Sequence, residues 1–153
     1  MTASQHLSSL GLALPAVPTP VGSYVPATRA GDLVYTSGQL PLVDGVLADT
    51  GVLASPDDVP RGAALARTAA LNAVAAAASV AGGLDAITRV VSVTVYVASA
   101  PGFYAQAGVA NGASDLLVAL FGDAGRHVRA AVGVACLPLD APVEVALVVQ
   151  AAA

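Results

Sequence analysis

Two charged residues, Arg129 and Glu144, lie inside the most apolar stretch of this 153-residue chain. The segments that contain them, 125–138 and 141–149, consist mainly of small and β-branched residues, which favour strands. A charged side chain is costly to bury unless it is paired or does chemistry. These two residues could therefore pair with each other, or both could serve one site.

The two segments are expected to form a hairpin, because two prolines and an aspartate lie between them. An antiparallel register would place Glu144 opposite Ala135 and Arg129 opposite Gln150. At the usual strand rise, the two charged residues would lie on the order of 20 Å apart. They would not pair within one subunit, so a site that uses both needs a second copy of the chain. The alternative is that each lies near a strand end and reaches solvent.

Four other side chains are candidates for chemistry, and each also has a structural interpretation. His127 could act as a base or a ligand, although a single histidine beside two arginines is more often a structural polar contact. Tyr24 could anchor a loop or line a pocket, and Ser37 could cap a turn or present its hydroxyl to a ligand. Cys136 is expected to be a small buried residue, since free cysteine is among the most buried types.

The composition favours an oligomer without nucleic-acid or membrane partners. Hydrophobic residues make up 56% of the chain and charged residues 10%, too few charges to cover a monomer comfortably. The net charge of −4, with no cluster of Lys and Arg, gives no general attraction for nucleic acid. One cysteine excludes an intrachain disulfide and a Cys-based metal cluster. Proline and glycine interrupt the longest uncharged stretches, and the first residues lack the basic start of a secretory signal, so we expect a cytoplasmic protein.

The order of expected elements predicts an α+β domain, with helices on one face of a mixed or antiparallel sheet. Residues 1–20 are expected to be an extended N-terminal arm, and residues 21–153 a single domain. The expected elements are a hairpin of strands 23–28 and 33–37, a loop at 42–54, a helix at 59–81 after a Ser-Pro-Asp-Asp start signal, a strand at 87–98, a helix at 114–121 capped by Ser114, and the terminal hairpin.

A set of short motifs, taken together, resembles the RidA/YjgF family of small deaminases, which hydrolyse reactive enamines and imines released by pyridoxal-phosphate enzymes. The resemblance covers about residues 20–150. The longer arm and an insertion at about 102–125 are typical of a divergent subgroup. The motifs are Gly22-x-Tyr24, Thr36-Ser37-Gly38-Gln39, Leu71-Asn72 in the long helix, Arg129, Leu137-Pro138 and Val143-Glu144-Val145.

The resemblance implies a chorismate-mutase-like fold, a homotrimer with sites in the clefts between subunits, and no metal or organic cofactor. Arg129 matches the arginine that grips a substrate carboxylate, and Glu144 the acid that positions or protonates at the step of water attack. Tyr24 and Ser37 match residues that contact substrate or ordered water. Ala131 stands where the best-studied deaminases have a cysteine, so the activity depends on whether that thiol or the backbone does the polar work.

These expectations amount to hydrolysis of a 2-imino acid to a 2-oxo acid and ammonia, with a small carboxylate-bearing molecule as substrate. The main alternative is a non-catalytic trimer that binds a small carboxylate and regulates or buffers it. Ribonuclease activity, which has also been attached to this family under the name endoribonuclease L-PSP, is disfavoured by the acidic charge balance.

Overall fold

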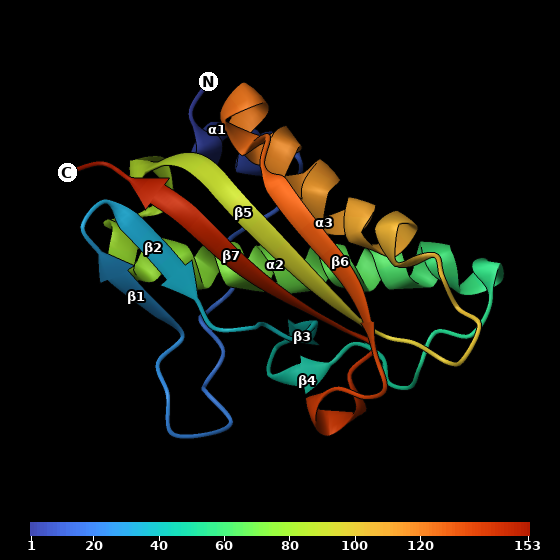
Figure 1. The fold of residues 1–153 in the computed structure, drawn as a ribbon. Helices are drawn as coiled ribbons and strands as arrows, with labels where there is room; N and C mark the ends of the chain where they lie inside the picture. Colours follow the sequence, from blue (N-terminus) through green and yellow to red (C-terminus); the bar gives the residue numbers. More distant parts are fainter.

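A mixed five-stranded sheet with two long helices on one face forms the body of the protein (Figure 1). The computed structural model describes residues 1–153. The strand order is β1-β2-β7-β5-β6, and the other face of the sheet carries no helix. The predicted α+β class, with helices on one face of a mixed sheet, is therefore confirmed. The elements are α1 (Ala3–Ser9), β1 (Ala27–Ala30), β2 (Leu33–Thr36), β3 (Leu42–Val43), β4 (Val46–Leu47), α2 (Val59–Ala81), β5 (Ile87–Ala98), α3 (Gln106–Phe121), β6 (Val128–Val134) and β7 (Val143–Ala151).

Local turn signals produce two hairpins, of which one was expected. β1 and β2 pair around Gly31, whose φ of +65° suits glycine at a tight turn. The expected loop at 42–54 contains a second, two-stranded hairpin, β3–β4. Asp44 and Gly45 connect its strands at φ of 51° and 80°, the left-handed pair that a two-residue hairpin turn requires. The Asp-Gly dipeptide was thus the signal for this hairpin.

The predicted terminal hairpin is wrong, because β5 lies between β6 and β7 (Figure 1). β5 pairs with β6 in parallel and with β7 antiparallel. Strand β5 is long and buries its valines at 90, 93, 95 and 97 completely, as a central strand does. The connection 135–142 is long enough to cross the end of β5, whereas a tight turn would only join direct neighbours. It contains the 3-10 turn Pro138–Asp140, in which Leu139 and Asp140 both have a φ of +60°.

The predicted boundaries of the long helix α2 are confirmed. A 3-10 turn, Pro56–Asp58, precedes the helix, and the Asp58 carboxylate accepts hydrogen bonds from the backbone of Ala54 and Ser55 at 2.7 and 3.2 Å. Gly82 ends the helix at a φ of 99°. The segment Pro56–Ala81 is long and apolar enough to cross a membrane, but 61% of its most apolar window is buried inside the fold. It is the core helix of this domain.

Helix α3 begins at Gln106, earlier than the predicted start at Ser114, so Ser114 lies inside the helix and does not cap it. Gly108 and Gly112 made the first half of α3 look unlike a helix, because glycine weakens helix interiors. At Gly112 the missing side chain allows close packing. A Cβ atom at position 112 would overlap the backbone of Ala63 in α2, so α2 and α3 touch backbone to backbone there.

Replacing Gly112 with alanine is expected to lower the free energy of unfolding by about 3 kcal/mol, because the backbones of α2 and α3 would have to separate. Gly108→Ala is the matched control on the same helix, since its Cβ would lie 3.1 Å from Cγ1 of Val59, a side chain that can move. Chemical denaturation of both variants measures the difference. Equal midpoints for Gly108→Ala and Gly112→Ala would contradict the close helix contact.

The N-terminal segment differs from the extended arm that was expected, because its first residues form α1. Thr2 and Gln5 form a capping box, and Leu7 is buried. The α1 helix docks on α3, where Nδ1 of His6 lies 2.7 Å from the carbonyl oxygen of Leu120. Residues 12–20 contain neither helix nor strand and run along the surface toward the sheet.

Candidate functional site

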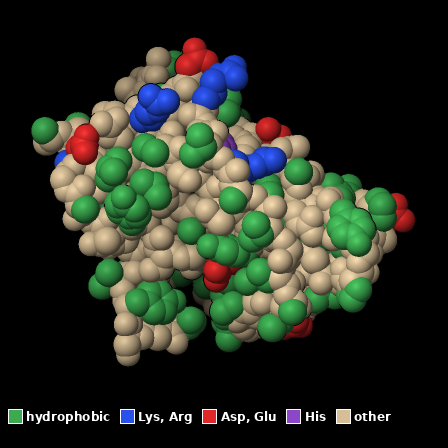
Figure 2. All heavy atoms as spheres, viewed as in Figure 1, with side chains coloured by type: hydrophobic (Ala, Val, Ile, Leu, Met, Phe, Trp, Pro, Cys, Tyr) green, Lys and Arg blue, Asp and Glu red, His purple; other side chains and the backbone are tan.

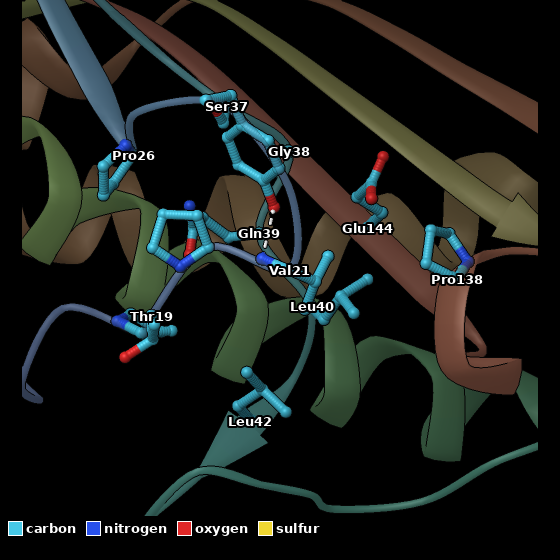
Figure 3. Close-up of a pocket in the computed structure, with 13 residues that line it drawn as sticks. Thr19, Val21, Pro26, Ser37, Gly38, Gln39, Leu40, Leu42, Pro138 and Glu144 are labelled. Atoms are coloured by element: carbon cyan, nitrogen blue, oxygen red, sulfur yellow. Dashed lines mark hydrogen bonds between the residues drawn. The ribbon is translucent and has the colours of Figure 1, made fainter.

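A cavity of about 390 Å³ opens where β7 begins, between the end of the N-terminal segment and the turn at Pro138 (Figure 3). It brings together Tyr24, Ser37 and Glu144, three of the five residues that the resemblance assigned to the site. No arginine, lysine or histidine lines it. The lining residues are Pro18, Thr19, Pro20, Val21, Tyr24, Pro26, Ser37, Gly38, Gln39, Leu40, Leu42, Pro138 and Glu144.

The Glu144 carboxylate is the only charged group in this cavity. It is half-buried, with Val143 and Val145 completely buried on either side of it along β7. No hydrogen bond or ion pair to a protein group neutralises it, and burial raises the pKa of the Glu144 carboxyl above its usual range. A carboxyl group in such surroundings is suited to exchange protons with a bound molecule.

Gly38 makes room for the Glu144 side chain. A Cβ atom at position 38 would lie 2.6 Å from both Cδ and Oε2 of Glu144. The backbone after β2 therefore packs directly beside the Glu144 carboxylate (Figure 3). The glycine of the Ser-Gly-Gln motif thus has a steric reason, because a side chain there would overlap Glu144. Gln39 continues the wall and forms a bridge to Val145, with backbone hydrogen bonds of 2.8 and 2.9 Å in the two directions.

The polar groups of Tyr24 and Ser37 are engaged with nearby backbone. The Ser37 hydroxyl donates to the carbonyl oxygen of Val25 at 2.6 Å. The Tyr24 hydroxyl accepts from the backbone N–H of Val21 at 3.2 Å, a bond drawn in Figure 3. Tyr24 therefore fastens the stretch that supplies Pro18, Thr19, Pro20 and Val21 to the cavity wall. The loop-anchor interpretation therefore holds for Tyr24, whereas the Ser37 hydroxyl caps no turn and ties the end of β2 to the stretch before β1.

Replacing Tyr24 with phenylalanine is expected to accelerate amide hydrogen exchange at Val21 by about fivefold, since one hydrogen bond contributes about 1 kcal/mol. Tyr104→Phe is the control, because the Tyr104 side chain is 88% exposed and its hydroxyl forms no hydrogen bond in the structure. Exchange at Val21 that stays as slow as in the wild type would show that Tyr24 does not fasten this stretch.

Arg129 and Ala131 lie away from this cavity, on β6. Arg129 pairs with Val93 of β5, and its side chain reaches α3 on the helical side of the sheet. Glu144 pairs with Tyr96 on the same strand and faces the open side. Arg129 and Glu144 are three residues apart along the strand direction and two strands apart across the sheet, so their Cα atoms lie about 14 Å apart. This distance is shorter than the one that the expected hairpin implied. The two side chains point to opposite faces, so they form no ion pair within one chain, as expected.

Ala131 is half-buried against the hydrophobic core. His127 has the structural role that was favoured, with Nε2 2.8 Å from the Ser114 hydroxyl and Nδ1 2.6 Å from the carbonyl oxygen of Gly125. Cys136 is exposed, which contradicts the expected burial, because it lies in the connection outside the core. No group of three or more His, Cys, Asp or Glu side chains could hold a metal ion.

Sequence reasoning missed Asn111 and Ser114, which hold the Arg129 guanidinium. Asn111 Oδ1 accepts from Nη1 of Arg129 at 2.8 Å, and Ser114 Oγ accepts from the same atom at 3.1 Å. Their signal in the sequence is two polar residues three apart, which lie on one face of a helix. The late predicted start of α3 concealed that spacing.

Comparison with known proteins decides the family. The model of the family described as YjgF/chorismate mutase-like, putative endoribonuclease matches residues 4–151. This chain belongs to the YjgF family. The match extends the resemblance, which began near residue 20, over most of the N-terminal segment, so α1 lies within the matched region.

Three known proteins show what this YjgF-family chain is similar to. Protein TCP17 of Trypanosoma cruzi is 44% identical over 146 residues, which is 95% of this chain and 91% of that protein. A putative endoribonuclease of Shewanella oneidensis has a TM-score of 0.92 at 32% identity, covering 98% of this chain and 99% of that one. RidA of the Antarctic bacterium Psychrobacter has a TM-score of 0.62 at 28% identity, covering 88% and 93%. The chorismate-mutase-like fold of the family is thereby confirmed.

Proposed function

We propose that this YjgF-family protein hydrolyses reactive 2-imino and enamine acids to 2-oxo acids and ammonia. The observation that carries the proposal is the Glu144 carboxyl, half-buried, without a protein partner and with a raised pKa, in a cavity of about 390 Å³. The likeness to a RidA supports the same reaction class. A cavity of this size suits a small molecule rather than a polymer.

In the proposed reaction, a water molecule beside Glu144 attacks the carbon of the C=N bond. The imine reacts as its protonated iminium form, and the carboxylate takes a proton from the attacking water, so the carbon then carries a hydroxyl and a neutral amino group. Glu144 returns the proton to the amino nitrogen, and the C–N bond breaks as the hydroxyl oxygen forms the carbonyl group. The hydroxyl proton passes to the Glu144 carboxylate and then to solvent, and the oxo acid and ammonia leave. Imines already hydrolyse in water, so positioning and one proton relay supply the required gain without a metal or organic cofactor.

The carboxylate of the substrate needs a cation, and the cavity of one chain has none. We propose that Arg129 of a second copy supplies it, in a homotrimer with shared clefts. The open sheet face supports association, because Val132, Tyr96 and Glu144 form one row across three strands, and Val128 is 69% exposed. Figure 2 shows mainly hydrophobic and neutral groups over the middle of this face, with arginine side chains toward the top and a hollow beside the loop that precedes β1. Sedimentation equilibrium measures the assembly directly.

The proposed activity is tested with imino acids that an amino-acid oxidase generates in situ. Semicarbazide traps the imine, so an active hydrolase lowers the amount of trapped product and accelerates the release of oxo acid. The expected result is a dose-dependent acceleration that heat-denatured protein does not give. Equal rates with and without folded protein would remove the proposal.

A second candidate is a non-catalytic protein that binds a small carboxylate. Ala131 favours this candidate, because the family's best-studied deaminases have a cysteine at that position. The hydroxyls of Tyr24 and Ser37 favour it as well, because both are engaged in hydrogen bonds with the backbone. Calorimetry that shows binding of a 2-oxo acid, together with no turnover of imines, would support this candidate. Arg129-dependent cleavage of RNA by purified protein would instead support the ribonuclease activity in the family's description.

We propose a cytoplasmic location together with the hydrolysis of imino acids, because that is where pyridoxal-phosphate enzymes would release such imines.

A further inference from the structure

The guanidinium of Arg129 is held from one side only. Its Nη1 atom donates to Oδ1 of Asn111 at 2.8 Å and to the hydroxyl of Ser114 at 3.1 Å, and Nη2 donates to the carbonyl oxygen of Ala107 at 3.4 Å. A guanidinium has five N–H groups. Both N–H groups of Nη1 and one N–H of Nη2 therefore donate to helix α3. The N–H of Nε and the other N–H of Nη2 have no acceptor in the chain.

The Ser114 hydroxyl is itself oriented by His127. Nδ1 of His127 lies 2.6 Å from the carbonyl oxygen of Gly125, which can only accept, so Nδ1 carries the proton. In the neutral ring, Nε2 is then an acceptor, and the Ser114 hydroxyl donates to it at 2.8 Å. The oxygen lone pairs of Ser114 remain for Arg129. The hydrogen bonds thus run in one consistent direction, from Arg129 through Ser114 and His127 to the backbone at Gly125.

We propose that Asn111 and Ser114 are positioning residues that present the Nε–Nη2 edge of Arg129 to the substrate carboxylate, with His127 setting the direction of the Ser114 hydroxyl. This inference rests on the proposed function. Two N–H groups on neighbouring nitrogens match the two oxygens of a carboxylate in a bidentate contact. A lysine at position 129 could not make that contact while it also bound Asn111 and Ser114.

The location of these hydrogen bonds argues against a purely structural role. Arg129 and Asn111 are both exposed, and hydrogen bonds between exposed side chains contribute little to stability. The same bonds remove rotamer freedom from a long side chain before a ligand arrives, which favours binding. Loss of Asn111 or Ser114 should therefore affect ligand affinity far more than folding.

The test measures KM and kcat for an imino acid, and the dissociation constant of the matching 2-oxo acid by calorimetry, for Asn111→Ala and Ser114→Ala. Each variant should raise KM and the dissociation constant by about fivefold to tenfold, with kcat within about twofold of the wild type. Ser114→Thr, which keeps the hydroxyl, should restore the wild-type values. Asp115→Ala is the control on the same helix, because Asp115 is exposed and does not touch Arg129.

A double-mutant cycle separates positioning from other effects. In an Arg129→Ala background, Asn111→Ala should have no further effect on the dissociation constant, because nothing remains to be positioned. Two results would overturn the inference while leaving the proposed function intact, provided that the wild type is active. One is an unchanged KM for Asn111→Ala, and the other is an equal loss of affinity from Asn111→Ala in the wild-type and Arg129→Ala backgrounds. A wild type that neither binds nor hydrolyses would overturn the proposed function and this inference together.

Discussion

Replacing Arg129 with alanine is expected to lower kcat/KM for imino-acid hydrolysis by about 10²-fold or more. The variant removes both N–H donors offered to the substrate carboxylate, and each hydrogen bond to a charged group contributes about 1.5–3 kcal/mol. The exposed position on edge strand β6 makes a large loss of stability unexpected, so thermal midpoints should change little. Steady-state kinetics with the oxidase-coupled assay measures the effect.

Arg126→Ala is the control for this prediction. Arg126 is an arginine just before β6, its side chain is 77% exposed, and its ion pair with Asp123 lies outside the proposed site. The Arg126→Ala variant should keep wild-type kinetics. If both arginine variants lost activity equally, a general effect of positive charge would explain the result, and the specific role of Arg129 would be wrong.

Replacing Glu144 with glutamine is expected to reduce kcat by about 10²–10⁴-fold, the usual contribution of a positioned proton-transfer group. The variant keeps the shape of the side chain beside Gly38 but cannot take a proton from water. In the wild type, the carboxylate is the active form, so the rate should rise with pH through a pKa above the usual range for glutamate. A pH–rate profile that is unchanged in Glu144→Gln would contradict the assignment of this group.

The same substitution is expected to stabilise the fold at neutral pH. Burial raises the folded-state pKa of Glu144 above its unfolded value, so the folded chain binds the proton more tightly. Stability from this group is therefore present at low pH and is lost as the pH rises from the unfolded pKa through the folded one. Glu144→Gln removes that loss, and its melting temperature should exceed that of the wild type above this window. Asp115→Asn, an exposed carboxylate, should not show the difference.

Elements with signals in their own residues could be predicted from the sequence. Strand β5 has the predicted bounds 87–98, helix α2 has the predicted start and end, and Gly31 turns the first hairpin. The pairing of β6 with β5 could not be predicted in this way, because strand order depends on contacts between segments far apart in the chain. The first half of α3 was missed for a related reason: Gly112 weakens the helix locally and is explained only by the backbone of Ala63.

The site divides in the same way. Tyr24, Ser37 and Glu144, which the resemblance assigned to the site, line one cavity of the structure; their grouping came from that resemblance and not from spacing. The holding of Arg129 by Asn111 could not be anticipated, since it needs the correct start of α3 and the correct neighbour of β6. Cys136 was expected to be buried because free cysteine usually is, but it is exposed, because the connection that contains it lies outside the core.

The central claim is that Arg129 of one copy and Glu144 of another form one site, and complementation between inactive variants tests it most directly. Arg129→Ala and Glu144→Gln chains, carrying different tags, are co-expressed, and assemblies that contain both are isolated and assayed. In a closed homotrimer, each isolated mixed assembly would have one of its three shared clefts with an intact arginine and an intact glutamate, so activity should return toward about one third of the wild-type value. Mixed assemblies as inactive as their parents would contradict the shared site.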